Sequence, residues 1–341
     1  MKVLFQAYNT CCQTESGGVQ VRVRRIKELL EERAIIVDFF CSFSTKLKDY
    51  DVLHIFSLTS ESLSLAICAK KLGLRVVISP IVNVTRQRAK SIRRSLLFYR
   101  IIRHYTSDLL EHQLYQLLEV SDAILVESPS EALFIEKYYK MPSEKIRVVP
   151  NGVDNPKPAN QSIFKLLNKE CRYCLQVGRI DKNKNLLNTI KAVKGANYDL
   201  VVIGGPYAVS NDDYYDRCRK EAAGCDNIHF LGWLDSKSDL LASAYQNAQA
   251  LILPSKTETF GLVAVEAAIY GTHICIANNL PILDYGVFNQ DLTFDASDIS
   301  EIRKVLDKAM SLPKNDDVKE AVTQQFSWYK IIDEILQAYH I

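Results

Sequence analysis

The sequence contains no apolar run of the roughly 18–20 residues that a membrane span requires, so an integral membrane protein is not expected. Its opening residues, MKVLFQAYN, turn polar too early for a signal peptide and predict a first strand instead. With 48% hydrophobic and 24% charged residues, the 341-residue chain is also unlike a disordered or fibrous protein. We therefore expect a cytoplasmic protein that forms a sizeable core, as two domains or one large one.

Patterns typical of metal sites are missing as well. The six histidines form neither an HExxH nor an HxH pair. Cys171 and Cys174 form the only CxxC pair. A zinc site would need a second pair at fixed spacing, and the nearest candidates, Cys218 and Cys225, are seven residues apart. No metal centre is predicted, and the nine cysteines are expected to be free thiols because the cytosol keeps thiols reduced.

The net charge of +2 conceals an uneven distribution. Residues 1–150 hold 22 Lys and Arg against 16 Asp and Glu, a net charge of +6, whereas the remainder holds 20 against 24, a net charge of −4. Much of the excess lies in Arg86–Arg103, where cations are interspersed with residues such as Ile92 and Leu96. Such a basic amphipathic helix could lie peripherally on an anionic surface, such as the inner face of the cytoplasmic membrane. Alternatively, it packs its apolar stripe on the core. No nucleic-acid-binding motif accompanies it, so no nucleic-acid partner is expected.

Short β-branched-rich runs alternate with helical patterns such as Val19–Glu32 and Ser60–Leu72. One series of strands is predicted at Lys2–Ala7, Ile35–Phe40, Val52–Phe56, Val76–Ser79, Ala123–Glu127 and Ile146–Val149. A second series is predicted at Tyr173–Val177, Leu200–Ile203, Ile228–Phe230, Ala250–Leu253 and His273–Ala277. This alternation predicts parallel sheets covered by helices on both faces. The polar stretch Asn151–Asn160 predicts a linker between two doubly wound, Rossmann-like α/β domains.

In such sheets ligands bind outside the carboxyl ends of the strands, so the strand-to-helix loops are the places to search for a site. The first of these loops carries Gly17 and Gly18 before a helix. Glycines let a ligand approach the backbone, and a helix N-terminus favours anions. The loop is not a GxGxxG motif, and no acidic residue ends the second strand in the expected register, so a dinucleotide-dependent oxidoreductase is not predicted.

The loop after Tyr173–Val177 places two cations near one strand tip. Gly178 is followed by Arg179, and Lys184 lies five residues later at the entrance to a helix. Together the cations suit a diphosphate, because Arg makes forked contacts with phosphate oxygens and Lys supplies a point charge. The alternative is a solvated basic loop without a ligand.

The segment Glu258–Glu266 follows the predicted strand Ala250–Leu253 and joins a loop glutamate to a helix that begins around Gly261. The free amides at the start of that helix can hold a phosphate. Glu266 falls inside the helix among small apolar neighbours, so its carboxylate needs a partner, and the hydroxyls of a ribose would serve. The alternative is a helix glutamate bonded to local backbone.

Taken in order, these residues resemble the family 4 glycosyltransferases (GT4), which are retaining enzymes with the GT-B fold. The resemblance extends over most of the chain, and the pair Glu258-x7-Glu266 is its most specific motif. Its other motifs are Gly17-Gly18, Asp51–His54, Ser121–Ala123 with Ser128, Val149–Asp154, Val177–Arg179 with Lys184, Gly204-Gly205 and Phe230–Trp233. The tail Phe326–Trp328 also resembles the family's final helix, which crosses back onto the first domain.

This resemblance implies two Rossmann-like domains facing each other across a cleft. Residues 1–153, joined by a C-terminal helix at about 325–341, would bind the acceptor, and residues 154–324 would bind the donor. The implied reaction moves a sugar, with retention, from a nucleotide-diphosphate sugar to a growing glycan, such as a lipid-linked or cell-surface polysaccharide precursor. A UDP-sugar is slightly favoured over a GDP-sugar, and neither a metal nor another cofactor is implied.

The resemblance also assigns roles residue by residue. Arg179 and Lys184 would neutralise the departing diphosphate, and Glu258 would contact hydroxyls of the donor sugar. The other implied donor contacts are those of Glu266 with ribose, of the Phe260, Gly261 and Leu262 amides with phosphate, of Trp233 and Leu234 with the base, and of Gly17, Gly18 and Gly178 around the phosphates.

Two segments depart from the family pattern. Many relatives carry a histidine that faces the donor sugar, whereas residues 76–83 contain none, so Ser79 or Asn83 could take over its contact. The family's Gly-Gly-x-Pro-Glu segment is replaced by Asn278–Ile282. A different histidine, His54, lies within an apolar strand and is predicted to be a satisfied core residue.

Two rival functions stay open. One is a nucleotide-sugar epimerase or phosphorylase of the same fold, although no pyridoxal-phosphate lysine can be identified. The other is a non-catalytic glycosyltransferase-like partner subunit. The joint presence of both cations and both glutamates argues against the partner subunit, because a protein without activity would not require them together.

Overall fold

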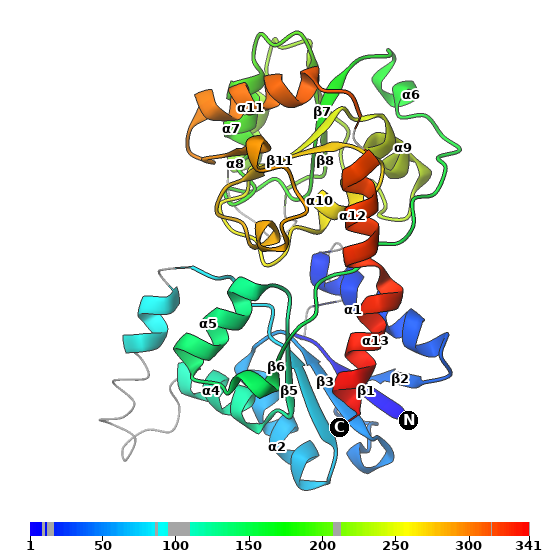
Figure 1. The fold of residues 1–341 in the computed structure, drawn as a ribbon, viewed down its shortest axis with the longest axis vertical. Helices are drawn as coiled ribbons and strands as arrows, with labels where there is room; N and C mark the ends of the chain where they lie inside the picture. The colour runs from blue at the N-terminus through cyan, green and yellow to red at the C-terminus, as the bar shows by residue number, and fades with distance from the viewer. Residues whose placement is uncertain are drawn as a thin grey trace. The chain divides into compact units, whose positions relative to one another are not determined.

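The computed structural model describes residues 1–8, 11, 17–85, 88–94, 110–206, 213–314 and 316–340. They form two compact units (Figure 1). The N-terminal unit comprises Met1–Gly152 together with Trp328–Ile341, and the C-terminal unit comprises Val153–Ser327. The chain therefore leaves its first unit after one sheet, builds the second unit, and returns to complete the first.

The N-terminal unit is built on six parallel strands in the order β2-β1-β3-β4-β5-β6. These strands are β1 (Lys2–Gln6), β2 (Ile36–Phe39), β3 (Val52–Phe56), β4 (Arg75–Ser79), β5 (Ala123–Val126) and β6 (Ile146–Val148). Successive side chains point to opposite faces of a strand, so a sheet covered on both faces needs apolar residues at nearly every position.

Helices cover both faces of this sheet. On one face Val3 and Phe5 share a core with α1 (Gly18–Glu31) and α13 (Trp328–Tyr339). On the other face Leu4 shares a core with α2 (Leu63–Lys71), α4 (Leu110–Val120) and α5 (Pro129–Tyr139). The alternation of core residues along β1 thus fixes which helices lie on which face.

The C-terminal unit repeats the plan with six parallel strands in the order β12-β11-β10-β7-β8-β9. Its strands are β7 (Tyr173–Val177), β8 (Asp199–Ile203), β9 (Ile228–Phe230), β10 (Ala250–Leu253), β11 (His273–Ala277) and β12 (Thr293–Phe294). Its helices are α6 (Phe164–Leu167), α7 (Leu186–Val193), α8 (Tyr214–Glu221), α9 (Asp239–Asn247), α10 (Leu262–Ala268), α11 (Ile299–Ser311) and α12 (Asp316–Phe326).

The first strand of each unit lies inside its sheet, with the second strand on one side and a later strand on the other. In the N-terminal sheet β1 lies between β2 and β3, and in the C-terminal sheet β7 lies between β8 and β10. The direction of winding therefore reverses at β1/β3 and at β7/β10. Ligands of open α/β sheets bind in the crevice outside the carboxyl ends of the strands at such a switch point.

The predicted parallel α/β architecture is confirmed, and each of the eleven predicted strands appears within one residue at both ends. Strand β12 was not predicted, because two residues are too few to give a periodic signal. The predicted helix over Ser60–Leu72 is divided, since Ser60–Ser62 forms a 3-10 turn before α2 begins.

Helix α13 is fixed to the N-terminal sheet at several points. A Cβ at Gly152 would lie 2.2 Å from the Trp328 ring, so only glycine allows this close packing. The side chain of His54 hydrogen-bonds the Tyr339 hydroxyl through Nδ1 at 2.7 Å and the Ser79 hydroxyl through Nε2 at 2.9 Å. Burial holds the pKa of His54 well below its ordinary value. His54 is therefore a neutral, satisfied core residue, as predicted.

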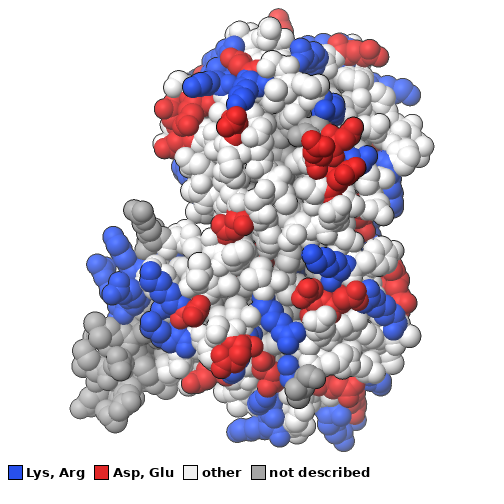
Figure 2. All heavy atoms as spheres, in the orientation of Figure 1, with Lys and Arg blue, Asp and Glu red and all other residues white. Residues whose placement is uncertain are grey.

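Residues 88–94, in the described part of the basic segment, form a helix with two different faces. Ala89 and Ile92 are buried in the core, whereas Lys90, Arg93 and Arg94 are exposed. Figure 2 shows Lys and Arg side chains gathered on this part of the N-terminal unit. This stretch thus matches the core-packing alternative, while residues 86, 87 and 95–103 lie outside the described residues. None of the described helices has both the length and the apolar character to cross a membrane.

Candidate donor site at the β7/β10 switch point

The tips of β7 and β8 approach each other through two glycines. Gly178 and Gly204 have φ angles of +135° and +130°, which residues with side chains rarely adopt. A Cβ at Gly204 would lie 1.9 Å from the carbonyl oxygen of Gly178, so no other residue fits there. The predicted position Gly178 therefore belongs to a strand tip whose backbone can be approached closely.

Trp233 lies beside these tips, just after β9. The amide of Gly204 donates to the carbonyl of Gly232 at 2.7 Å, and a Cβ at Gly205 would lie 2.6 Å from the indole Nε1. The indole is 39% exposed, whereas Leu234 is partly buried against the core. Trp233 thus presents a flat apolar surface at the carboxyl end of the sheet.

The loop that carries Lys184 is held by its own polar side chains. A carboxylate oxygen of Asp181 accepts hydrogen bonds from the amides of Asn183 and Lys184, both at 2.9 Å. The carbonyl of Lys184 accepts from Gln176 Nε2 at 2.9 Å. Next, Asn185 has a left-handed backbone with φ of +56° and caps α7. These contacts fix the backbone from which the Lys184 side chain projects.

Lys184 and Glu258 meet directly. The ammonium Nζ of Lys184 lies 2.5 Å from Oε1 of Glu258, and the side chains are only 20% and 14% exposed. The guanidinium of Arg179 lies 3.5 Å from the Asp181 carboxylate and is about half exposed. The structure therefore brings both predicted cations and the loop glutamate to the β7/β10 switch point. Water screens the Lys184–Glu258 pair less than it screens exposed charges.

Asn183 joins the two loops that carry this pair, and sequence reasoning missed it. Its side-chain Nδ2 donates to the carbonyl of Thr257 at 2.9 Å. Its side-chain Oδ1 accepts from the amide of Thr257 at 3.1 Å and from the Thr257 hydroxyl at 2.9 Å. The amide of Lys256 adds a bond to the Asn183 carbonyl at 2.8 Å. We call this group the Asn183–Thr257 clamp. It fixes the residue before Lys184 to the residue before Glu258.

Helix α10 begins at Leu262, so the predicted helix start around Gly261 is confirmed. Gly261 caps the helix with φ of +104°, and a Cβ there would press 3.0 Å against Leu253. Phe260 is buried with its ring edge-on to Phe326 at a centroid distance of 5.4 Å. The side chains at the start of α10 therefore pack against the core, and only backbone groups there could make the predicted phosphate contact.

Part of the altered segment Asn278–Ile282 supports the same region. Asn279 Nδ2 donates to the carbonyl of Lys256 at 2.8 Å. Ile282 is fully buried and lies 3.8 Å from the position that a Cβ of Gly261 would occupy. This segment therefore braces the Glu258 loop and the start of α10.

Glu266 is half-buried on α10 and has a partner that the sequence did not reveal. The hydroxyl of Tyr245, from α9, donates to Oε2 of Glu266 at 2.8 Å. Burial raises the pKa of Glu266, whereas the hydrogen bond from Tyr245 lowers it. The negative charge of Asp154 raises it further. The alternative of a glutamate bonded to local backbone is therefore wrong, because a side chain of another helix holds one carboxylate oxygen.

Two predictions fall on the N-terminal unit. Gly17 caps α1, and Gly17 and Gly18 are exposed, with open space where a Cβ would lie. Their contact with donor phosphates stays a prediction. Ser79 is fully buried and bonded to His54, so it does not replace the family's histidine. Asn83 is exposed.

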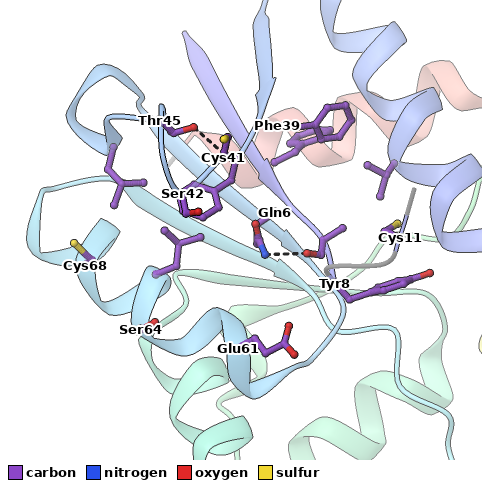
Figure 3. Close-up of a pocket in the computed structure, with 16 residues that line it drawn as sticks. Gln6, Tyr8, Cys11, Phe39, Cys41, Ser42, Thr45, Glu61, Ser64 and Cys68 are labelled. Atoms are coloured by element: carbon purple, nitrogen blue, oxygen red, sulfur yellow. Dashed lines mark hydrogen bonds between the residues drawn. The ribbon is translucent and has the colours of Figure 1, made fainter. Parts of the chain in front are cut away.

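The N-terminal unit has a pocket of about 930 Å³ at the carboxyl ends of β1 and β2 (Figure 3). Gln6 lies at its centre, with Phe39 and Glu61 on opposite sides. Glu61 belongs to the turn after β3, so the pocket borders the β1/β3 switch point. No sequence motif predicted it.

Comparison with known proteins agrees with the motifs. The model of the family "Glycosyl transferases group 1" matches residues 159–325, and that of "Glycosyltransferase Family 4" matches residues 43–155. An uncharacterised 41.2 kDa protein in the cps region of Klebsiella pneumoniae is 27% identical over 313 residues, covering 86% of this chain and 80% of that protein.

Other relatives carry names of specific enzymes. D-inositol 3-phosphate glycosyltransferase of Mycolicibacterium smegmatis is 27% identical, with 66% of this chain and 54% of that enzyme covered. The O-antigen chain mannosyltransferase RfbU of Salmonella typhimurium is 31% identical, with 47% and 41% covered. Among solved structures, HepE of Anabaena in complex with UDP has a TM-score of 0.76 at 16% identity, with 99% of each chain covered. This last likeness shows a shared fold.

Proposed function

Because the chain is a group 1, family 4 glycosyltransferase with the GT-B fold, we propose that it moves a sugar from a nucleotide-diphosphate sugar to a growing glycan. The observation that carries the proposal is the meeting of Lys184 with Glu258, beside Arg179, at the β7/β10 switch point. The names of the relatives support a glycan acceptor, since one is a protein in a cps region and another is named an O-antigen chain mannosyltransferase.

The proposed chemistry follows from where charge develops. When the bond between the sugar and the diphosphate breaks, negative charge accumulates on the phosphate oxygens. Fixed donors at that position stabilise the transition state, because they need no rearrangement as the charge appears. Lys184 and Arg179 would meet this charge, as would the backbone amides of Phe260–Leu262. The reaction would retain the anomeric configuration and would not require a metal.

Each glutamate of the motif would have its own role. Glu258, oriented by Lys184 in the structure, would accept hydrogen bonds from hydroxyls of the donor sugar. Glu266 would bind ribose through the carboxylate oxygen that Tyr245 does not occupy. Trp233 and Leu234 would lie near the base, and Gly17, Gly18 and Gly178 would leave room around the phosphates.

The donor nucleotide would be UDP rather than GDP, in line with the UDP held by the structural neighbour HepE. The C-terminal unit would bind this donor and the N-terminal unit the acceptor. The acceptor would be a lipid-linked or cell-surface polysaccharide precursor. We place the enzyme in the cytoplasm, where the basic segment Arg86–Arg103 could hold it peripherally on the inner membrane face.

A thermal-shift panel of UDP-, GDP- and ADP-sugars tests the donor, because ligand binding raises the apparent stability by mass action. We expect the largest shift with a UDP-sugar and slow release of UDP from it. A shift without any nucleotide release, with or without acceptor, would favour a non-catalytic partner subunit. Conversion of the UDP-sugar without UDP release would favour an epimerase.

A further inference from the structure

The pocket of the N-terminal unit lies where a ligand of this sheet would be expected. It is lined by residues at the carboxyl ends of β1 and β2 and in the segments that follow β1, β2 and β3, and it borders the β1/β3 switch point. Its volume of about 930 Å³ falls within the roughly 300–1,000 Å³ of small-molecule sites. The position and the size therefore both point to a binding site.

The charge of the pocket limits what it can bind. None of the sixteen described residues that line it is Lys, Arg or His, and the one charged side chain among them is Glu61. A phosphate group would face this carboxylate without a counter-charge from the lining, and like charges repel. An anionic ligand is therefore disfavoured, in contrast to the Lys184 site.

The lining combines an aromatic face with polar groups. The Phe39 ring is 45% exposed and packs edge-to-face on the buried Phe5 ring at a centroid distance of 6.3 Å. Opposite it lies Glu61, and the hydroxyls of Ser42 and Ser64 also line the pocket. A sugar ring matches this arrangement, because it has an apolar C–H face and a rim of hydroxyl donors. An alkyl chain would instead desolvate the Glu61 carboxylate without giving it a partner.

One wall of the pocket is held in place by contacts within the protein. The hydroxyl of Thr45 accepts from the amide of Cys41 at 2.9 Å, and the amide of Thr45 donates to the Cys41 carbonyl at 2.9 Å. Phe39 is held by its contact with Phe5. A preorganised wall avoids the cost of ordering a loop on binding.

We propose that this pocket binds an uncharged sugar residue of the acceptor, with the apolar face of the sugar on Phe39 and its hydroxyls directed to Glu61. The inference rests on the proposed function, because it names the class of acceptor for the same reaction. It sets the chain apart from enzymes whose acceptor sugar or polyol is phosphorylated.

Ligand-observed NMR with saturation transfer can test this inference on the full chain in the presence of UDP. The probes are methyl α-glucoside, methyl α-galactoside and methyl α-mannoside, the 6-phosphates of these sugars, and octyl β-glucoside. We expect saturation of the ring protons of at least one neutral glycoside and none for the phosphates. Preferred binding of a phosphate, saturation confined to the octyl chain, or no saturation of any probe would overturn the inference.

Variants connect the signal to the pocket. Phe39→Ala should weaken glycoside binding at least tenfold, whereas Phe43→Ala should leave it unchanged, because Phe43 is 99% exposed and does not line the pocket. Glu61→Lys should reverse the preference and admit a sugar phosphate. Equal binding by the wild type and Phe39→Ala would place the sugar elsewhere and refute the proposal.

The same samples separate this inference from the proposed function. UDP binding depends on the C-terminal unit and should be equal in the wild type and Phe39→Ala. UDP binding without any glycoside signal would overturn the pocket assignment alone. Glycoside binding that Phe39→Ala removes, in a protein that binds no nucleotide, would support the pocket as a sugar site and contradict the donor assignment.

Discussion

The strand orders of the two sheets are related, but the side chains at their switch points differ in charge and polarity. At β7/β10 of the C-terminal unit, strand ends formed by glycines lie beside Lys184, Arg179 and Glu258. At β1/β3 of the N-terminal unit, Phe39 and Glu61 face each other across a pocket whose described lining has no cation.

This difference shows which part of the chain decides the ligand. The strands of both units are nearly all apolar, because both faces of each sheet are covered. The residues that differ lie at the strand ends and in the segments that follow them, and the topology brings these to the same edge of the sheet. Two ligands of different charge can therefore be bound by one architecture, one at each switch point.

The substitution with the largest expected effect removes the charge at β7/β10. Lys184→Ala should lower turnover about 100- to 1,000-fold, the typical cost of one preorganised donor to a developing anion. Donor affinity should fall much less, because the lost contact is strongest in the transition state. Steady-state kinetics with a UDP-sugar measure both effects. Lys182→Ala, in the same loop, is the control. Near-normal turnover of Lys184→Ala, or loss of wild-type activity with a chelator, would contradict the mechanism.

Disrupting the Asn183–Thr257 clamp should cause the second-largest loss of turnover. Asn183→Ala removes three side-chain hydrogen bonds, each with a net contribution of about 0.5–1.5 kcal/mol, so we expect turnover to fall roughly 10- to 100-fold. Because the clamp acts through Lys184 and Glu258, kcat should change more than the affinity for UDP.

Thr257 offers a matched pair of variants for the clamp. Thr257→Ser keeps the hydroxyl that donates to Asn183, and Thr257→Val removes it while keeping the shape. Turnover should be retained in the first variant and reduced several-fold in the second. Identical turnover in both variants would mean that the clamp does not position the pair.

Removing the Tyr245 hydroxyl should have a smaller effect, about tenfold or 1.4 kcal/mol, on the affinity for UDP. Glu266 would accept hydrogen bonds from ribose more strongly as a carboxylate than as a neutral carboxyl group, so UDP binding should weaken as the pH falls through the raised pKa of Glu266. The Tyr245 hydrogen bond lowers that pKa, so Tyr245→Phe should move the loss of binding to higher pH.

Calorimetric titration with UDP over a pH series measures this shift. Tyr270→Phe is the control, because the Tyr270 hydroxyl donates to the Lys157 carbonyl and not to Glu266. A Tyr245→Phe profile that is weaker at every pH but has an unchanged midpoint would indicate a structural role only.

The smallest expected effect is on membrane binding by the surface of the N-terminal unit. If residues 86–103 contact an anionic membrane, a single substitution such as Arg93→Gln should weaken vesicle binding about fivefold, since one cation near the surface contributes about 1 kcal/mol. Co-sedimentation with anionic vesicles at two salt concentrations measures this. Equal binding to neutral and anionic vesicles, or none to either, would leave only the core-packing role seen for residues 88–94.

The sequence predicted those features that depend on order along the chain. Strand tips followed by charged loops share one edge of a parallel sheet, so Lys184 and Glu258 could be expected near each other. Tyr245 and Phe39 could not be found in this way, because Tyr245 lies on a helix face and Phe39 is the last residue of strand β2, and neither belongs to a spaced motif. Ser79 was misjudged because its direction, toward His54 in the core, depends on a helix far away in the sequence.

The return of α13 to the N-terminal unit has a consequence for how the chain is made. The sheet face built from Val3, Phe5 and Val52 stays partly uncovered until Trp328–Tyr339 has left the ribosome. Until then His54 lacks its Tyr339 partner, and the apolar residues of this face lack the cover of α13. Incomplete domains with exposed apolar surface are prone to aggregate, so this unit is exposed to that risk until α13 is available. The first unit to be translated is thus the last to finish folding.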